Sequence, residues 1–118
     1  MILHITSHDA WQSAQSSGAY RHASLESEGF IHTSTAKQVL AVAEAFYRGQ
    51  GGLVLLVIDE ARVQPEVRWE APAGAPAPGI SAGDMFPHIY GPLNLDAVVR
   101  VVDFAPDAGG KFSLPALD

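Results

Sequence analysis

The sequence of 118 residues contains no cysteine. This absence excludes disulfide bonds, thiolate metal sites, iron–sulfur clusters and cysteine nucleophiles. Hydrophobic residues nevertheless make up 47% of the chain and charged residues 17%, which is the composition of a folded protein and not of a disordered one. A chain of this length has room for one hydrophobic core, so we expect a single domain over residues 1–118.

Positive charge is also scarce, because seven Lys and Arg stand against thirteen Asp and Glu, a formal net charge of −6. These cations are dispersed along the chain, at Arg21, Lys37, Arg48, Arg62, Arg68, Arg100 and Lys111. Since nucleic acid and anionic membranes are bound through clustered cations, we expect neither DNA nor a membrane as a partner. No apolar run approaches the ~20 residues of a membrane span and no signal-peptide pattern follows Met1, so we predict a cytoplasmic protein.

The sequence also lacks a G-x-G-x-x-G motif or another phosphate-binding glycine loop. Neither Ser24 nor Ser34 lies in a G-x-S-x-G elbow, which argues against a serine hydrolase built on them. Nucleotide or hydrolase chemistry would therefore have to come from side chains gathered by the fold.

Hydrophobic periodicity predicts short elements in the first half of the chain. The apolar run at 1–6 predicts a buried strand, and Ser7 is placed to cap a helix that ends at Gly18. Residues 23–29 predict one helical turn before a short strand at 30–33. Thr35 and Gln38 fit a capping box for the next helix, whose apolar stripe is Val39, Val42, Ala43 and Phe46.

The second half of the chain predicts mostly strands. The apolar run 53–58 predicts a central strand with both faces covered, followed by a strand at 67–70. Residues 71–83 are rich in proline and glycine and predict an irregular, mobile loop, and the proline-flanked segment 86–92 predicts an edge strand. With a last strand at 97–104, the pattern indicates the α+β class, with two small sheets or one bent sheet and helices beside them.

Three histidines, His4, His32 and His88, lie inside predicted strands. Because strand side chains alternate between faces, each shares a face with a hydroxyl residue two positions on: Thr6, Ser34 and Tyr90, respectively. One such histidine is most simply explained as a packed residue that hydrogen-bonds a carbonyl group. Three at equivalent positions favour one polar cleft, while His8 and His22 are predicted to be surface residues.

Other polar residues carry a weaker signal. Three histidines can hold a catalytic zinc with an open position, but these come from separate strands, so we predict no metal site and keep a three-histidine metal hydrolase as the least favoured alternative. Glu28 and Glu70 are candidate carboxylates for which a solvated or structural role is simpler. Arg21 is close to the His32 strand in sequence and is a candidate to contact a phosphate, but a solvent-facing role is the simpler explanation.

These residues resemble an uncharacterised bacterial family, the domain of unknown function nine-five-two. The matching segments cover nearly the whole chain and include 1–5, 18–20, 24–34, 53–59, 67–70 and 86–93, with the two histidine motifs around His32 and His88 the most specific. That family is similar to the ADP-ribosyltransferase-like superfamily, which includes NAD-dependent ADP-ribosyltransferases and RNA 2′-phosphotransferases. The resemblance implies a split pair of small β-sheets with flanking helices and NAD in the cleft between them.

The resemblance also implies three site positions. They correspond to His4, holding a ribose, to His32 with Thr33 and Ser34, and to His88, which stands where the toxins of the superfamily carry a glutamate. A carboxylate stabilises the positive charge that develops on the sugar when the nicotinamide bond breaks, whereas histidine is better suited to binding phosphate or moving protons. Glu70 or Asp84 is expected to supply the acid if the 71–83 loop folds over the cleft.

The functional expectation is therefore a pocket for NAD, as the cofactor, or a related nucleotide, with transfer of an ADP-ribosyl or phosphoryl group as the expected reaction. Ser34 would donate to a phosphate, and Tyr90 or Trp69 would stack on a ring. RNA is expected only as a phosphorylated substrate, and the oligomeric state is left open. A non-catalytic ligand-binding or interaction module is the main alternative.

Overall fold

A three-stranded antiparallel sheet forms one half of the protein, of which the computed structural model describes residues 1–72, 78–80 and 83–117. Its strands lie in the order β1 (Ile2–Ser7), β4 (Leu53–Ile58) and β8 (Val98–Phe104). All six residues of β4 are buried. The prediction of a central strand covered on both faces is therefore confirmed, since six consecutive apolar side chains must bury both faces of the strand.

A second three-stranded antiparallel sheet contains β3 (Ile31–His32), β6 (Phe86–Tyr90) and β5 (Glu66–Glu70), in that order. The prediction that 86–92 is an edge strand was wrong, because β6 is the central strand. The sheet tolerates Pro87 because its carbonyl still accepts a hydrogen bond from the Thr33 backbone N–H at 3.2 Å. Proline has no N–H to return, which explains why β3 ends at His32.

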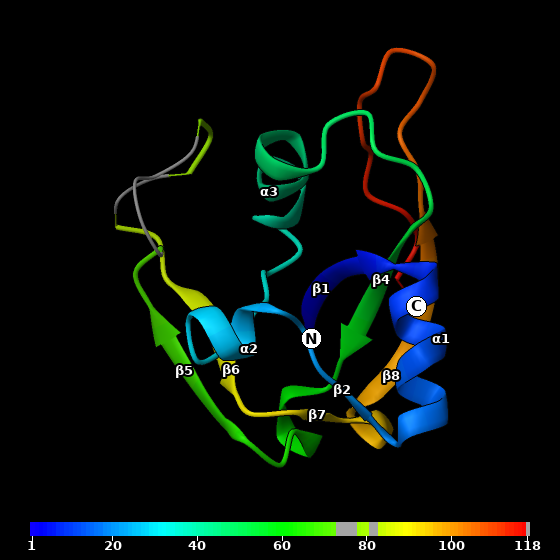
Figure 1. Cartoon of the computed structure of the whole chain (residues 1–118). Coiled ribbons are helices and arrows are strands. Elements are labelled where there is room, and N and C mark those ends of the chain that lie inside the picture. The colour runs from blue at the N-terminus through cyan, green and yellow to red at the C-terminus, as the bar shows by residue number, and fades with distance from the viewer. Residues whose placement is uncertain (73–77, 81–82, 118) are drawn as a thin grey trace.

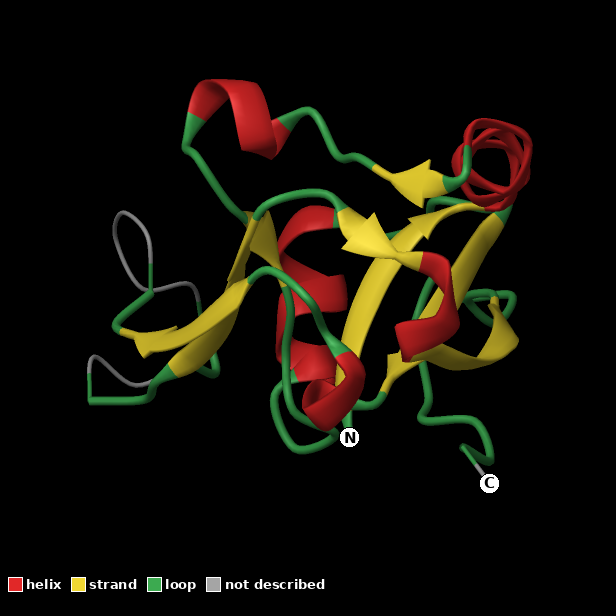
Figure 2. Cartoon of the chain, turned by 90° about the horizontal axis from the view of Figure 1, so that it is seen from below, coloured by secondary structure: helices red, strands yellow, loops and turns green. Residues whose placement is uncertain are grey.

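A third sheet pairs β2 (Ala19–Tyr20) with β7 (Leu93–Asn94). These two-residue strands were not predicted, because they are too short to show alternation in the sequence. The α+β class is confirmed, with three small antiparallel sheets in place of the expected two or one. Figures 1 and 2 show the two three-stranded sheets side by side, with α3 (Val39–Phe46) at their junction.

In the described residues, three helices and two 3₁₀ turns connect the strands. The helices are α1 (His8–Ser17), α2 (Ser24–Ser27) and α3, and the 3₁₀ turns are η1 (Glu60–Arg62) and η2 (Leu95–Ala97). The predicted caps of α1 are confirmed: the Ser7 hydroxyl accepts from the Ala10 N–H, and Gly18 ends the helix with φ of 92°. Glycine is suited to that left-handed conformation because it has no Cβ to clash.

The start of α3 differs from the prediction. Regular helix begins at Val39, after a turn in which the Gln38 side chain accepts from the Thr35 N–H, so half of the capping box is present. Val39 and Ala43 are buried as predicted, but Phe46 is 67% exposed. Phe46 is the last residue of α3, where the helix no longer packs on the core. The amphipathic pattern does not show where that packing ends.

Two apolar cores lie on the opposite faces of the β1–β4–β8 sheet. Even-numbered β4 residues (Val54, Leu56, Ile58) pack with Ile31 and Ile89 of the second sheet. The odd-numbered β4 residues pack with α3 and with the C-terminal segment, including Phe112. The β1–β4–β8 sheet is thus covered on one face by the second sheet and on the other by α3 and the C-terminal segment.

One backbone bridge fixes how the two sheets meet. Leu3 of β1 and Ser34 exchange N–H···O bonds of 2.7 and 2.8 Å. This bridge sets residues 32–34 beside the free edge of β1, where the polar site lies. Of the predicted 71–83 loop, residues 73–77 and 81–82 are outside the described part. Among the described helices, none has the length and apolar character needed to cross a lipid bilayer.

Candidate functional site

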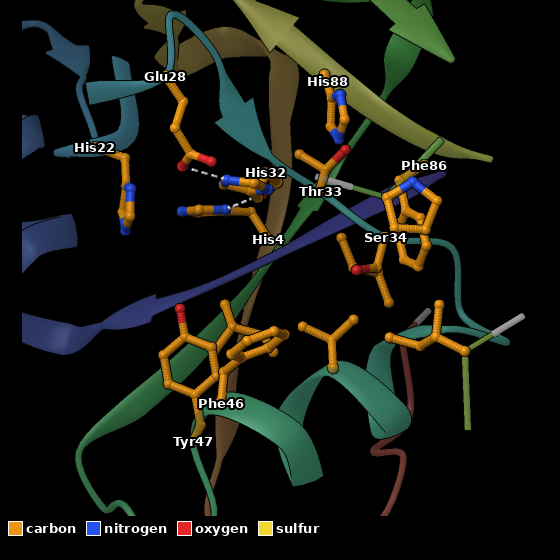
Figure 3. A pocket seen from close by; sticks show the side chains of 15 residues that line it. His4, His22, Glu28, His32, Thr33, Ser34, Phe46, Tyr47, Phe86 and His88 are labelled. Carbon is orange, nitrogen blue, oxygen red and sulfur yellow. Dashed lines mark hydrogen bonds and ion pairs between the residues drawn. The ribbon is translucent and has the colours of Figure 1, made fainter. Parts of the chain in front are cut away.

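A pocket of about 420 Å³ opens where β1, the 28–34 segment, α3 and β6 meet (Figure 3). Its volume is in the range typical of small-molecule sites. It is lined by Leu3, His4, Ile5, His22, Glu28, His32, Thr33, Ser34, Val42, Phe46, Tyr47, Pro72, Ile80, Phe86 and His88. The structure thus brings the three strand histidines to one pocket.

Three other residues singled out in the sequence do not line this pocket. The Trp69 indole N–H donates to Glu60 at 2.9 Å, and Trp69 is 42% exposed. Glu70 and Tyr90 contact each other behind His88. A stacking role for Trp69 or Tyr90 stays a prediction, and the aromatic side chains placed to meet a ligand are Phe46, Tyr47 and Phe86.

His4 is enclosed and fully engaged. It is 3% exposed; its Nδ1 donates to the His32 carbonyl, and its Nε2 lies 2.8 Å from the Tyr20 hydroxyl. A carbonyl only accepts, so Nδ1 carries the proton and Nε2 accepts from Tyr20. The Thr6 hydroxyl, 2.8 Å from that of Tyr20, extends the chain.

This network keeps His4 neutral. Burial lowers the pKa of His4 to about 3, because a charged imidazole would lose its hydration with no carboxylate to compensate it. Burial likewise raises the pKa of Tyr20 to about 12. Both ring nitrogens of His4 are used inside the protein, so the residue holds β1 against β3 and has no nitrogen left for a ribose.

His32 is the most accessible of the three. Its side chain is 43% exposed, and its Nε2 lies 2.7 Å from a carboxylate oxygen of Glu28 (Figure 3). Because the carboxylate accepts, Nε2 carries the proton and the neutral ring leaves Nδ1 as an acceptor. The expectation that Glu28 is simply solvated was wrong: the end of α2 places Glu28 in the pocket as the partner of His32.

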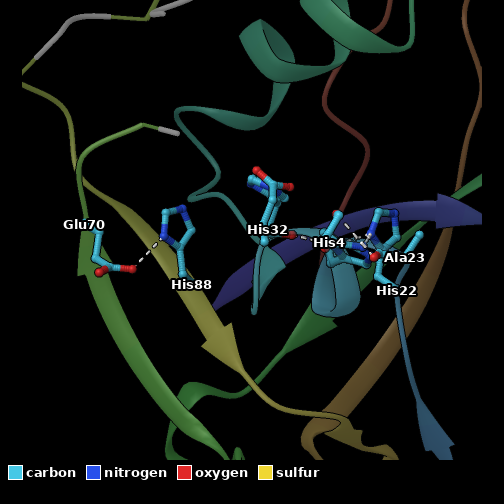
Figure 4. Close-up of polar contacts among 9 residues, drawn as sticks. His4, His22, Ala23, His32, Glu70 and His88 are labelled. Atoms are coloured by element: carbon cyan, nitrogen blue, oxygen red, sulfur yellow. Dashed lines mark hydrogen bonds and ion pairs between the residues drawn. The ribbon is translucent and has the colours of Figure 1, made fainter. Parts of the chain in front are cut away.

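His88 has a similar arrangement on β6. Its Nδ1 donates to Glu70 of the neighbouring strand at 2.9 Å, and its ring stacks on Phe30 with centroids 4.0 Å apart (Figure 4). Its Nε2 has no hydrogen-bond partner among the described residues. His88 lines the pocket, so Nε2 is the ring nitrogen that remains for a ligand there.

The carboxylate of Glu70 holds two donors at once. Hydrogen bonds from Tyr90 and then from His88 lower the pKa of Glu70, so it is ionised near neutral pH. The same Glu70 contact is the main cause of the raised pKa of Tyr90. Glu70 therefore orients His88 from behind and does not line the pocket itself; nor does Asp84.

His22 was predicted to be a surface residue, and this was wrong. It lines the pocket, with its ring centroid 5.3 Å from that of His4. Its Nδ1 accepts from the Ser24 backbone N–H at 3.1 Å. Burial is the main cause of its lowered pKa. The sequence shows only that His22 precedes a helical serine by two residues. This spacing allows the local contact with Ser24 but does not indicate that the ring lines a pocket formed by distant segments.

The hydroxyl residues after His32 have different roles. The Thr33 hydroxyl donates to the Pro87 carbonyl and supports the β3–β6 contact. The hydroxyl of Ser34 has no partner among the described residues and opens on the pocket. Within the described part of the chain, Ser34 is therefore the hydroxyl available to a ligand, whereas Thr33 holds the backbone.

A metal ion finds no prepared site here. In residues 1–72, 78–80 and 83–117, no group of three or more His, Asp or Glu side chains is arranged to hold one. Both nitrogens of His4 are hydrogen-bonded inside the protein, so the three strand histidines leave two nitrogens for a ligand, one on His32 and one on His88, fewer than the three that a catalytic zinc takes.

A family model described as Protein of unknown function (DUF952) matches residues 5–101. No curated protein matches the chain. Protein CC0527 of Caulobacter crescentus, solved by X-ray crystallography, is 34% identical with a TM-score of 0.81, covering 96% of this chain and 93% of that one. Its solution NMR structure is 33% identical with a TM-score of 0.77, covering 99% and 97%. Since the family model spans most of the residues, and the fold agrees with these structures over nearly the full length, the chain belongs to the DUF952 family.

Proposed function

We propose that the pocket binds NAD or a related nucleotide and transfers its ADP-ribosyl group, or a phosphoryl group, with His32 and His88 as the acid–base pair. The proposal rests on one observation. The two imidazoles line the same pocket with ring centroids 5.6 Å apart, and each has one nitrogen hydrogen-bonded to a glutamate, while the other nitrogen has no partner among the described residues.

This arrangement suits proton transfer. A carboxylate beside an imidazole fixes its orientation and stabilises the imidazolium that forms when the ring takes a proton. His32 is held by Glu28 and His88 by Glu70, so both rings are ready to accept and return a proton. A packed structural histidine such as His4 has neither property.

ADP-ribosyl transfer exchanges one bond at ribose C1′ for another. The bond from ribose C1′ to the nicotinamide nitrogen breaks, and its electron pair leaves with the ring, which becomes neutral. A hydroxyl oxygen of water or an alcohol forms the new bond to C1′ and gives its proton to an imidazole. Glu28, which lines the pocket, is the carboxylate available to stabilise the positive sugar, in place of the glutamate missing at His88.

For phosphoryl transfer the same pair acts differently. One imidazole takes the proton of the attacking hydroxyl as the new P–O bond forms. The other gives a proton to the leaving oxygen as the old P–O bond breaks. RNA carrying a 2′-phosphate is the substrate to test in this case.

Titration calorimetry with NAD, ADP-ribose and a 2′-phosphorylated RNA tests the proposal. We expect heat with at least one of them, and its loss in the His32→Ala variant. His8→Ala is the matched control, because His8 is exposed on α1 and does not line the pocket. No heat with any ligand in the unmodified protein would overturn the proposal. Binding without any reaction would leave the non-catalytic module as the correct function.

A further inference from the structure

The pocket lacks positive charge. None of the seven lysines and arginines is among its lining residues, and residues 73–77, 81–82 and 118 contain no lysine or arginine in the sequence. Glu28 is the charged residue on the wall, and Glu70 lies directly behind His88. A phosphate group inside the pocket would therefore meet no permanent counter-charge.

The histidines do not supply that charge. Burial keeps His4 neutral, with a pKa of about 3, and lowers the pKa of His22. A proton taken up by His32 or His88 is matched by the glutamate that contacts it. The pocket therefore ranges from neutral to negative and suits an uncharged or cationic group.

The free nitrogens have a fixed donor and acceptor pattern. The Ser24 N–H occupies Nδ1 of His22, so the neutral His22 ring carries its proton on Nε2 and is a donor toward the pocket. Neutral His32 and His88 present acceptors, Nδ1 and Nε2. In the described part of the chain, none of these three nitrogens has another hydrogen-bond partner.

Two neighbouring acceptors fit two neighbouring hydroxyl groups, and one donor fits a carbonyl oxygen. The ribose of a nucleoside has the hydroxyl pair, and an amide or ketone on its base supplies the carbonyl. The aromatic rings of Phe46 and Tyr47, on the α3 side of the pocket (Figure 3), offer a surface for a flat or cationic ring.

We infer that the pocket recognises the nucleoside end of its ligand, with His22 as the donor to a base carbonyl, and that the phosphate groups stay outside. This inference rests on the proposed function and names the part of the nucleotide that is bound. It favours reaction at C1′ over phosphoryl transfer, because the phosphorus atom would lie away from His32 and His88.

Calorimetry at about pH 8, above the usual imidazole pKa of ~6.5, provides the test. The ligands are NAD, nicotinamide riboside, its 5′-phosphate and its 2′-deoxy analogue. We expect the riboside to bind at least as tightly as its 5′-phosphate, and the 2′-deoxy analogue to bind ~5- to 10-fold more weakly, the loss expected for one hydrogen bond.

The His22→Ala variant should weaken binding of the riboside by a similar ~5- to 10-fold. His22→Gln, which restores an N–H donor, should recover part of the loss, and His8→Ala should change nothing. Circular dichroism of each variant checks that the protein remains folded.

The outcomes separate the two proposals. If NAD binds but the riboside binds more than tenfold more weakly than its 5′-phosphate, the phosphate-free pocket is wrong while the proposed function stands. If His22→Ala and His8→Ala bind alike, the role of His22 is wrong. If neither NAD nor any riboside binds, the proposed function fails together with this inference.

Discussion

His4 of β1 and His88 of β6 both line the pocket and are equally buried, each 3% exposed. Each lies in a strand with a tyrosine hydroxyl nearby, yet their partners differ. His4 contacts a carbonyl and the Tyr20 hydroxyl, whereas His88 contacts the Glu70 carboxylate, which also holds Tyr90. Burial alone therefore does not decide what a histidine does; the charge of its partner and a free nitrogen do.

The three strand histidines therefore fall into two groups. His4 belongs to a neutral, closed network that positions the backbone of His32. His32 and His88 belong to carboxylate pairs with a nitrogen open to the pocket.

The largest effect is expected on catalysis. Replacing His88 or His32 by glutamine removes an acid–base group, and such groups contribute ~10²- to 10⁴-fold to rate. We expect the rate of nicotinamide release from NAD to fall by a factor of that order. Circular dichroism should show that the variants remain folded. A rate unchanged in both variants would show that neither imidazole moves a proton.

The next effect is on stability. His4→Ala leaves the His32 carbonyl without its side-chain partner, leaves the Tyr20 hydroxyl with Thr6 alone and opens a cavity, which should cost roughly 2–4 kcal/mol. Urea denaturation measures this loss, and the exposed His8→Ala variant should stay within about 0.5 kcal/mol of the unmodified protein. A His4→Ala protein as stable as His8→Ala would contradict the positioning role.

A pH dependence follows from the same residue. His4 has a pKa of about 3 in the folded protein and an ordinary value of 6.5 when unfolded. Below pH 6.5 the unfolded chain binds a proton that the folded chain does not. The His4 contribution, complete above that pH, is thus lost toward pH 3, with a slope of about 1.4 kcal/mol per pH unit.

Urea midpoints of the unmodified protein and His4→Gln between pH 7 and pH 4 measure this slope. The difference in stability between the two proteins should shrink as the pH falls. Parallel curves would indicate that His4 is not buried in its neutral form.

The smallest effect is expected on the pKa of Tyr90, which shares Glu70 with His88. Glu70→Gln removes the carboxylate that is the main cause of the raised pKa of Tyr90. We expect the Tyr90 pKa to fall toward its ordinary value, as measured by NMR titration of the ring. The raised pKa of Tyr20 should not change, because burial causes it.

The sequence predicted much of the framework from local patterns. The buried run of β4 and the Ser7 and Gly18 caps of α1 were correctly placed, because each depends on residues near one another in the chain. The edge position of β6 and the burial of Phe46 were predicted wrongly. Strand order and the end of a helix relative to the core depend on distant segments.

The candidate site shows the same limit. Alternation along three strands indicated that His4, His32 and His88 deserved comparison, and the structure brings them to one pocket. Alternation could not show that Glu28 would hold His32 or that Glu70 would hold His88. Nor could it show that His22 would turn inward.

The sequence by itself thus determined that the site is built on imidazoles. The chain has no cysteine to supply a thiol, and its seven lysines and arginines are dispersed and do not form a cluster. Only the tertiary structure decided which imidazoles keep a free nitrogen. The reason is physical: the state of a ring is set by the atoms within hydrogen-bond distance of it, and here those atoms come from other strands and turns of the chain.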